Sequence, residues 1–108
     1  MNDETTVVWQ RVATGSEIPE DEGKAVAVGD RRIAIFNVGG TFYATDDTCT
    51  HEYASLAEGY VEGCVVECPL HAGEFDIRTG KALSPPVTVD IRTYPVRIEG
   101  DDILVRID

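Results

Sequence analysis

Apolar and polar residues alternate in short runs along most of this chain, which is typical of β-strands with one buried face. The clearest run covers residues 31–38. It lies between two turn signals, Gly29-Asp30 and Gly39-Gly40. We therefore expect two hairpins that pair this run with strands over 24–28 and 41–45.

The rest of the chain continues the same pattern of short strands separated by turn residues. Further strands are predicted over 7–12, 59–63, 64–67, 74–77, 87–94, 96–99 and 103–107. A helical turn is expected over 55–58, and the Ser84-Pro85-Pro86 segment is expected to be rigid and extended. Short strands at this spacing predict an all-β protein, an antiparallel sandwich or small barrel, rather than alternating β and α units.

The length of 108 residues corresponds to one domain, 1–108, which can bury a core without disulfides. No window approaches the roughly 18 apolar residues of a membrane span. The start of the chain is acidic and polar and lacks the features of a signal peptide. We expect a cytoplasmic monomer with reduced cysteines, in which neighbouring Cys and His residues are more often metal ligands than disulfide partners.

The net charge of −11 narrows the choice of partners. It disfavours nucleic acid and anionic membranes, where contacts from Lys and Arg dominate binding. It favours a protein partner that presents a basic patch and is found by electrostatic steering. The acidity also serves solubility, and charge alone does not separate these two roles.

Candidate chemistry is concentrated in one stretch that contains both histidines and two of the three cysteines. It begins with Cys49-Thr50-His51 and, after sixteen other residues, ends with Cys68-Pro69-Leu70-His71. Two thiolates and two imidazoles form a soft set of four ligands, which suits zinc or an iron–sulfur cluster. Structural zinc sites commonly pair a Cys-x2-4-Cys with a second pair of like residues. The unequal Cys-x-His and Cys-x-x-His halves disfavour zinc without excluding it.

These two half-motifs resemble the Rieske iron–sulfur motif, in which two cysteines bind one iron of a [2Fe–2S] cluster and two histidines bind the other. The resemblance implies that Cys49 and Cys68 bind the buried iron and that His51 and His71 bind the outer iron. It also implies the Rieske fold, with a two-loop cluster-binding subdomain over about 46–86.

The surrounding residues resemble the small Rieske ferredoxins of bacterial aromatic-ring-hydroxylating dioxygenase systems, such as those for biphenyl, toluene and naphthalene. The similar segments are 65–75, Thr79-Gly80-Lys81 and Ser84-Pro85-Pro86. The chain has no further histidines for a mononuclear iron site, so it is expected to be an electron carrier in aromatic hydrocarbon catabolism and not an enzyme. The resemblance implies two partners: an NAD(P)H-dependent flavoprotein ferredoxin reductase and a terminal Rieske non-haem iron oxygenase.

Two alternatives remain at this point. The carrier could serve a different oxygenase, such as a monooxygenase or a demethylase. A structural Cys2His2 zinc module is the other.

Residues beside the ligands have expected roles as well. Glu52, Tyr53, Leu70 and Ala72 flank the histidines and would surround an exposed redox edge as a docking surface, or else pack between the two loops. In the resembling family a proline loop covers the cluster, which implies that role for Pro85 and Pro86, and a simple edge turn is the alternative. The third cysteine, Cys64, lies in an apolar run and is interpreted as a small buried hydrophobe.

Departures from the respiratory Rieske proteins predict a low reduction potential. Their two extra cysteines, which form a disulfide, correspond to Ala54 and Leu70. Their Ser and Tyr, which donate hydrogen bonds toward the cluster, correspond to Gly73 and Phe75. Without those donors the extra negative charge of the reduced state is less stabilised.

We therefore predict a reduction potential near the low end of the Rieske range, about −150 mV. Voltammetry of the purified protein measures it directly. A value well above zero would contradict the reasoning from Gly73 and Phe75.

Overall fold

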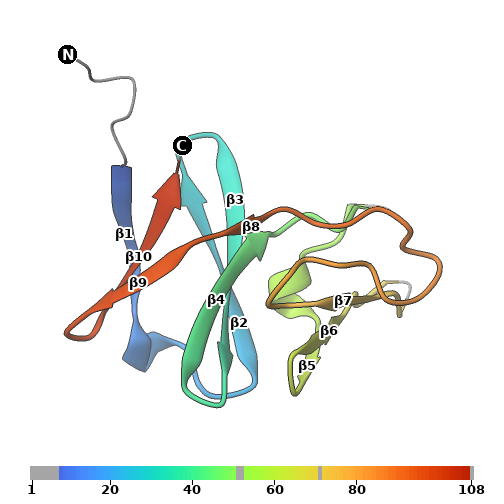
Figure 1. Ribbon diagram of the computed structural model, residues 1–108, viewed down its shortest axis with the longest axis horizontal. Coiled ribbons are helices and arrows are strands. Elements are labelled where there is room, and N and C mark those ends of the chain that lie inside the picture. Colours follow the sequence, from blue (N-terminus) through green and yellow to red (C-terminus); the bar gives the residue numbers. More distant parts are fainter. Residues whose placement is uncertain (1–7, 51–52, 71, 108) are drawn as a thin grey trace.

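The computed structural model describes residues 8–50, 53–70 and 72–107 and consists of three antiparallel sheets (Figure 1). The strands are β1 (Val8–Thr14), β2 (Glu22–Val28), β3 (Arg31–Val38), β4 (Thr41–Asp46), β5 (Tyr60–Glu62), β6 (Val65–Glu67), β7 (Glu74–Asp76), β8 (Thr93–Tyr94), β9 (Val96–Glu99) and β10 (Asp102–Ile107). Two short 3-10 helices, η2 (Gly15–Glu17) and η3 (Leu56–Glu58), complete the elements. Within the described ranges, no helix has the length and apolar content needed to cross a membrane.

Two of the sheets form the base of the molecule. One has the strand order β1-β10-β9 and the other has the order β2-β3-β4-β8. Their inward side chains share one apolar core, to which β1, β3, β4, β8 and β10 all contribute. The predicted all-β antiparallel architecture is confirmed.

Strand β3 is buried on both faces. Ile33 and Ile35 belong to the core of the base, whereas the alternate residues Ala34 and Phe36 belong to a second core. All four side chains are fully inaccessible to solvent. Because successive side chains of a strand point to opposite faces, this one strand forms the wall between the two cores.

The third sheet, β5-β6-β7, lies on the far side of that wall and contributes Val66 and Phe75 to the second core. Figure 1 shows this sheet at one end of the molecule, apart from β1, β9 and β10 at the other end. Gly23 of β2 permits the close packing here, since a Cβ at this position would lie 2.9 Å from the ring of Phe36 and 3.0 Å from the carbonyl oxygen of Ala57. The second core thereby attaches the small sheet and η3 to the base.

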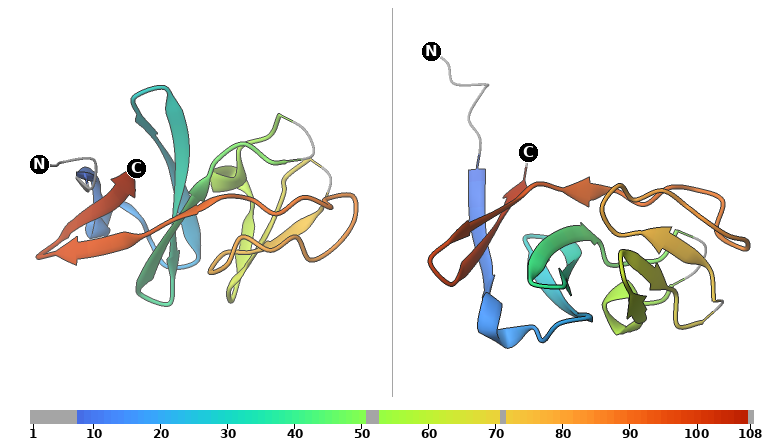
Figure 2. Two further views of the ribbon diagram at one scale, coloured as in Figure 1. Left: turned by 45° about the horizontal axis from the view of Figure 1, so that its top comes forward. Right: turned by 60° about the horizontal axis from the view of Figure 1, so that its bottom comes forward.

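The prediction of a strand over 87–94 is wrong for most of its length, because β8 covers only Thr93–Tyr94. Val87 and Ile91 are both buried in the second core, whereas Val89, which strict alternation would place on the same face, is 60% exposed. The Ile91 N–H donates to the Gly80 carbonyl at 2.8 Å, outside any sheet ladder. Both views in Figure 2 show this orange segment passing along the small sheet before it reaches β8. The other predicted strands and the helical turn are confirmed to within two residues at each end.

Tyr94 joins β8 to the end of β4 through a buried side chain. Its hydroxyl donates to Asp46 Oδ1 at 2.5 Å and accepts from Arg31 at 3.4 Å. The Arg92 guanidinium lies 4.9 Å from the centre of the ring, within cation–π range. Burial, and then the Asp46 carboxylate, raises the pKa of Tyr94 above its ordinary value.

We predict that Tyr94→Phe lowers the free energy of unfolding at neutral pH by about 1.5–3 kcal/mol, the usual contribution of a hydrogen bond to a charged group. The raised pKa means that the folded state favours the neutral phenol. This contribution is therefore fully present below about pH 10, the ordinary tyrosine pKa, and is lost as pH rises through the folded-state pKa. Unfolding curves at several alkaline pH values should show the wild-type advantage over Tyr94→Phe shrinking. Tyr60→Phe, which alters an exposed phenol, is the control and should change neither the free energy of unfolding at neutral pH nor its dependence on alkaline pH.

Candidate metal centre

Cys49 and Cys68 are both buried and belong to the same apolar core. Cys49 follows the end of β4, and Cys68 follows β6 directly. No disulfide joins any of the three cysteines, all of which the structure describes. The two predicted thiolate ligands are thus brought to one region from two different sheets.

Each cysteine begins a loop that the backbone closes in the same way. The Cys49 N–H donates to the Ala54 carbonyl at 3.0 Å, and the Cys68 N–H donates to the Gly73 carbonyl at 2.7 Å. In both cases the acceptor lies five residues beyond the cysteine. Residues 49–54 and 68–73 are called the first and second ligand loops below. Their matching closure holds each cysteine at the base of a compact turn.

The second ligand loop contains a strained residue. Ala72 has a φ of 60°, in the left-handed region that residues with a Cβ rarely adopt. Its N–H donates to the Cys68 carbonyl at 3.1 Å, which tightens the turn. Leu70, in the same loop, is 57% exposed.

A third segment, residues 84–90, contacts both ligand loops. The Thr50 hydroxyl donates to the Val89 carbonyl at 2.8 Å, and the Glu74 N–H donates to the Ser84 hydroxyl at 3.2 Å. Val87 packs so closely on Gly73 that a Cβ there would lie 2.7 Å from Val87 Cγ1. This segment therefore packs on the second ligand loop and is hydrogen-bonded to the first.

Sequence reasoning singles out Pro85 and Pro86 of this segment but misses the contacts of Val87 and Thr50. Pro85 is exposed and Pro86 is half-buried, whereas Val87 is buried in the second core. Valine is an ordinary residue in a predicted strand, so nothing in the sequence marks Val87 as a contact of the second ligand loop. The proline pair marks the segment but not the side chain that makes the buried contact.

The remaining predicted site residues include three that the structure does not describe and others whose exposure it shows. His51, Glu52 and His71 lie outside the described residues. Tyr53 is 93% exposed, and Ala72 is exposed as well. The prediction that Cys64 is buried within a strand is wrong: it is half-buried and lies in the turn before β6, which begins at Val65.

The described part of the site fits an iron–sulfur cluster. Buried thiolates at the bases of two closed loops suit a group that needs soft ligands and exclusion from water. Their surroundings in this core include the apolar side chains of Leu56, Phe75 and Val87.

Comparison with known proteins agrees with this geometry. Residues 8–95 match the family model described as Rieske [2Fe-2S] domain. The chain belongs to the Rieske [2Fe–2S] family. The ferredoxin component of a naphthalene 1,2-dioxygenase/salicylate 5-hydroxylase system from a Ralstonia species is 45% identical over 100 residues, which are 93% of this chain and 96% of the relative.

Two solved structures are similar throughout. The ferredoxin of Sphingomonas yanoikuyae B1 superposes with a TM-score of 0.86 at 37% identity, covering 91% of this chain and 97% of its own. A chain from the complex of reduced oxygenase and oxidized ferredoxin in carbazole 1,9a-dioxygenase has a TM-score of 0.84 at 40% identity and covers 90% and 91%. The resemblance to Rieske ferredoxins and the expected fold are confirmed. Like the other members of its family, this Rieske protein binds one [2Fe–2S] cluster.

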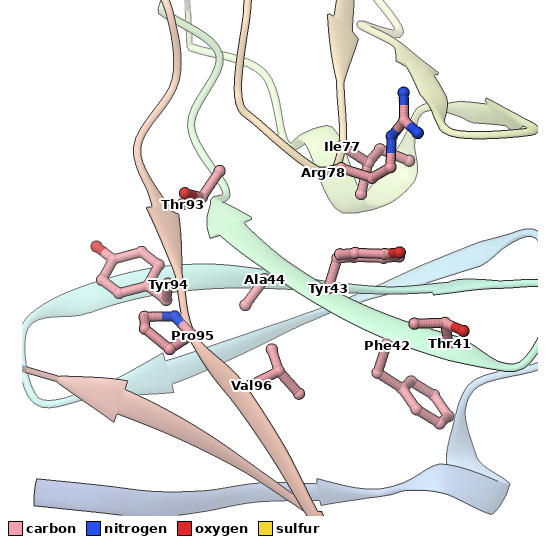
Figure 3. A pocket seen from close by; sticks show the side chains of 10 residues that line it. All are labelled: Thr41, Phe42, Tyr43, Ala44, Ile77, Arg78, Thr93, Tyr94, Pro95 and Val96. Carbon is pink, nitrogen blue, oxygen red and sulfur yellow. The ribbon is translucent and has the colours of Figure 1, made fainter.

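One surface hollow of this Rieske protein is lined by described residues that lie outside the ligand loops. It has a volume of about 460 Å³, and Figure 3 shows its lining side chains, which come from β4, from the turn after β7 and from the passage of β8 into β9. Arg78 on its border is held by Asp76 through bonds of 3.2 and 3.1 Å. The hydrogen bond from Arg78 lowers the pKa of Asp76 below its ordinary value. None of the described residues of the two ligand loops lines this hollow.

Two neighbouring substitutions test the geometry of the second ligand loop. Ala72→Gly should relieve the left-handed strain and stabilise the loaded protein by about 1 kcal/mol. Gly73→Ala should destabilise it, because the new methyl group would overlap Val87.

The measurement is the temperature at which the visible absorbance of the loaded protein disappears. Roughly 4–8 °C per kcal/mol is expected for a chain of this size. A higher midpoint for Gly73→Ala than for wild type would show that Val87 does not restrict this loop.

Proposed function

We propose that this chain is the ferredoxin component of an aromatic-ring-hydroxylating dioxygenase system. It would accept one electron from an NAD(P)H-dependent flavoprotein reductase and deliver it to the Rieske centre of a terminal oxygenase. The observation that carries the proposal is the pair of matching ligand loops in a protein whose whole length resembles ferredoxin components. The cluster supplies a reversible one-electron change, and the chain itself catalyses no bond chemistry.

We assign the ligands by residue. Cys49 and Cys68 would hold the buried iron, and His51 and His71 would hold the outer iron. The burial of both cysteines supports the first half of this assignment. The closed backbone of each loop supports rapid transfer, since a rigid ligand cage needs little rearrangement when the charge changes.

The docking surface would lie around the ligand loops. Tyr53 of the first loop and Leu70 of the second are large side chains that remain mostly exposed. Val89, in the segment that contacts Thr50, is 60% exposed. An apolar rim of this kind suits a small, transient interface, and the net charge of −11 suits a partner with a basic patch.

The cysteines and the proposed transient encounters with partners favour a cytoplasmic monomer. The three cysteines form no disulfide, which fits a reducing compartment. Each electron transfer needs a short encounter with one partner and then release, and a single exposed rim is enough for both partners in turn.

Reconstitution tests the proposed function. The reduced protein is mixed in separate experiments with a ring-hydroxylating dioxygenase, a monooxygenase and a demethylase, each of the Rieske type, and its reoxidation is followed by stopped-flow absorbance. We expect fast reoxidation by the dioxygenase, and NAD(P)H-dependent product formation when the reductase is added. Transfer only to a monooxygenase or demethylase would contradict the proposal. A colourless protein with one zinc and no iron would refute the ligand assignment.

Leu70→Asp should slow electron transfer to the oxygenase at least tenfold while leaving the visible spectrum unchanged, because a charge in the middle of an apolar rim opposes desolvation. The control is Ile98→Asp on β9, which adds the same charge at a similarly exposed apolar position in the other part of the protein. It should change the rate less than twofold. Equal rates for the two variants would place docking elsewhere, and loss of the cluster in Leu70→Asp would assign Leu70 to packing.

A further inference from the structure

Asp47 stands apart from the other carboxylates of this acidic protein. Among the residues that the structure describes, it is the only charged residue that is buried, with 1% of its surface exposed. It lies two positions before Cys49, between the end of β4 and the first ligand loop. A buried charge is costly unless hydrogen bonds and an opposite charge compensate it, so its contacts show what it holds in place.

The side chain of Asp47 binds the far end of the first ligand loop. Its Oδ1 accepts from the Ser55 hydroxyl at 2.8 Å and from the Ala57 N–H at 3.0 Å. Its Oδ2 lies 3.4 Å from Arg32 Nη2. One carboxylate therefore connects the residue before the loop, the residues after it and strand β3.

The backbone of Asp47 repeats these connections. Its N–H donates to the Arg32 carbonyl at 3.0 Å, and its carbonyl accepts from the Leu56 N–H at 2.7 Å. An isolated bridge between Thr48 and Ser55 lies just inside this pair. Contacts from Asp47 to Ser55, Leu56 and Ala57 thus join the two ends of the segment that contains Cys49.

The charge of Asp47 also acts at short range. Consecutive Cα atoms are about 3.8 Å apart, so the Cα atoms of Asp47 and Cys49 are separated by no more than roughly 7.6 Å. The side chain of Arg32 is 61% exposed, so water weakens the compensation that it offers. A buried negative charge this close to a ligand opposes the addition of an electron there.

We propose that Asp47 is a positioning residue that closes the first ligand loop and lowers the reduction potential of the bound cluster. The inference rests on Cys49 being a ligand, as proposed above, but not on the identity of any partner protein. Asparagine cannot replace Asp47 in full. If its amide oxygen accepts from Ser55 and Ala57, its amide N–H groups face the donors of Arg32.

Three variants separate closure from charge. Asp47→Asn removes the charge and keeps the size. Ser55→Ala removes one hydrogen bond of the closure and keeps the charge. Asp102→Asn is the matched control, since Asp102 is an exposed carboxylate paired with Arg11 at 2.9 Å in the other part of the fold.

Two properties of the loaded proteins are measured without any partner: the reduction potential by voltammetry and the rate at which a chelator removes iron. Visible circular dichroism reports the surroundings of the cluster, and far-ultraviolet circular dichroism reports the fold. We expect Asp47→Asn to raise the potential, change the visible dichroism and lose iron at least tenfold faster, which corresponds to about 1.4 kcal/mol. Ser55→Ala should lose iron faster with a much smaller change in potential, and Asp102→Asn should match wild type in both.

The results for Asp47→Asn and Ser55→Ala either support or overturn the proposed role of Asp47. The proposal is overturned if Asp47→Asn lowers only the thermal midpoint and has the same reduction potential and iron-loss rate as Asp102→Asn. Asp47 would then be a structural residue only. If Asp47→Asn takes up no cluster, Ser55→Ala decides: iron loss within twofold of Asp102→Asn overturns the proposal, and faster loss supports it. Failure of the proposed function looks different, since it would appear as wild-type protein that contains no iron or that no oxygenase reoxidises.

Discussion

The burial of β3 on both faces is the constraint on which the rest of the structure depends. One set of its side chains fills the core of the base, and the alternate set fills the core beneath the ligand loops. A shift of one residue in its pairing would exchange the two sets, placing Phe36 in the base and Ile35 beneath the loops. The two-residue turns that join β3 to β2 and to β4 fix the register on either side and oppose such a shift. The orientation of the metal centre relative to the base is therefore set by strand register, and no linker is involved.

The two ligand loops are held in place by their own contacts, in addition to the core that β3 supports. Each is closed by a backbone hydrogen bond at its cysteine, and the segment 84–90 contacts both of them. Since these closures use backbone groups, they depend little on the side chains at the loop tips. Tip residues such as Tyr53 and Leu70 are consequently available for contact with other proteins, while the bases of the loops remain fixed. This division suits a carrier that must keep its cluster and still present it to a partner.

Much of this arrangement could be predicted from the sequence, because two signals are strong. The paired turn signals around 31–38 identify the central hairpins, and the unequal Cys-His spacings identify the kind of cluster. The segment 87–92 could not be predicted, since β-branched residues favour a strand locally while the loops it contacts lie far away in sequence. Asp47 could not be recognised for a similar reason. In a chain with twenty acidic residues, nothing in the sequence distinguishes the one that the fold buries.

The close contact between Gly73 and Val87 connects packing with redox chemistry. Resemblance to the respiratory Rieske proteins places a hydroxyl donor at position 73, where this chain has glycine. Even the first atom of such a side chain would lie 2.7 Å from Val87 Cγ1, so a serine requires Val87 to move. Val87 is itself buried in the second core, among residues that support both cysteines. Phe75, at the position of the second donor, is fully buried and presents an aromatic ring without a polar atom. At position 73, therefore, a donor cannot be added without displacing Val87, because the packing that holds the second ligand loop occupies the space that the donor needs.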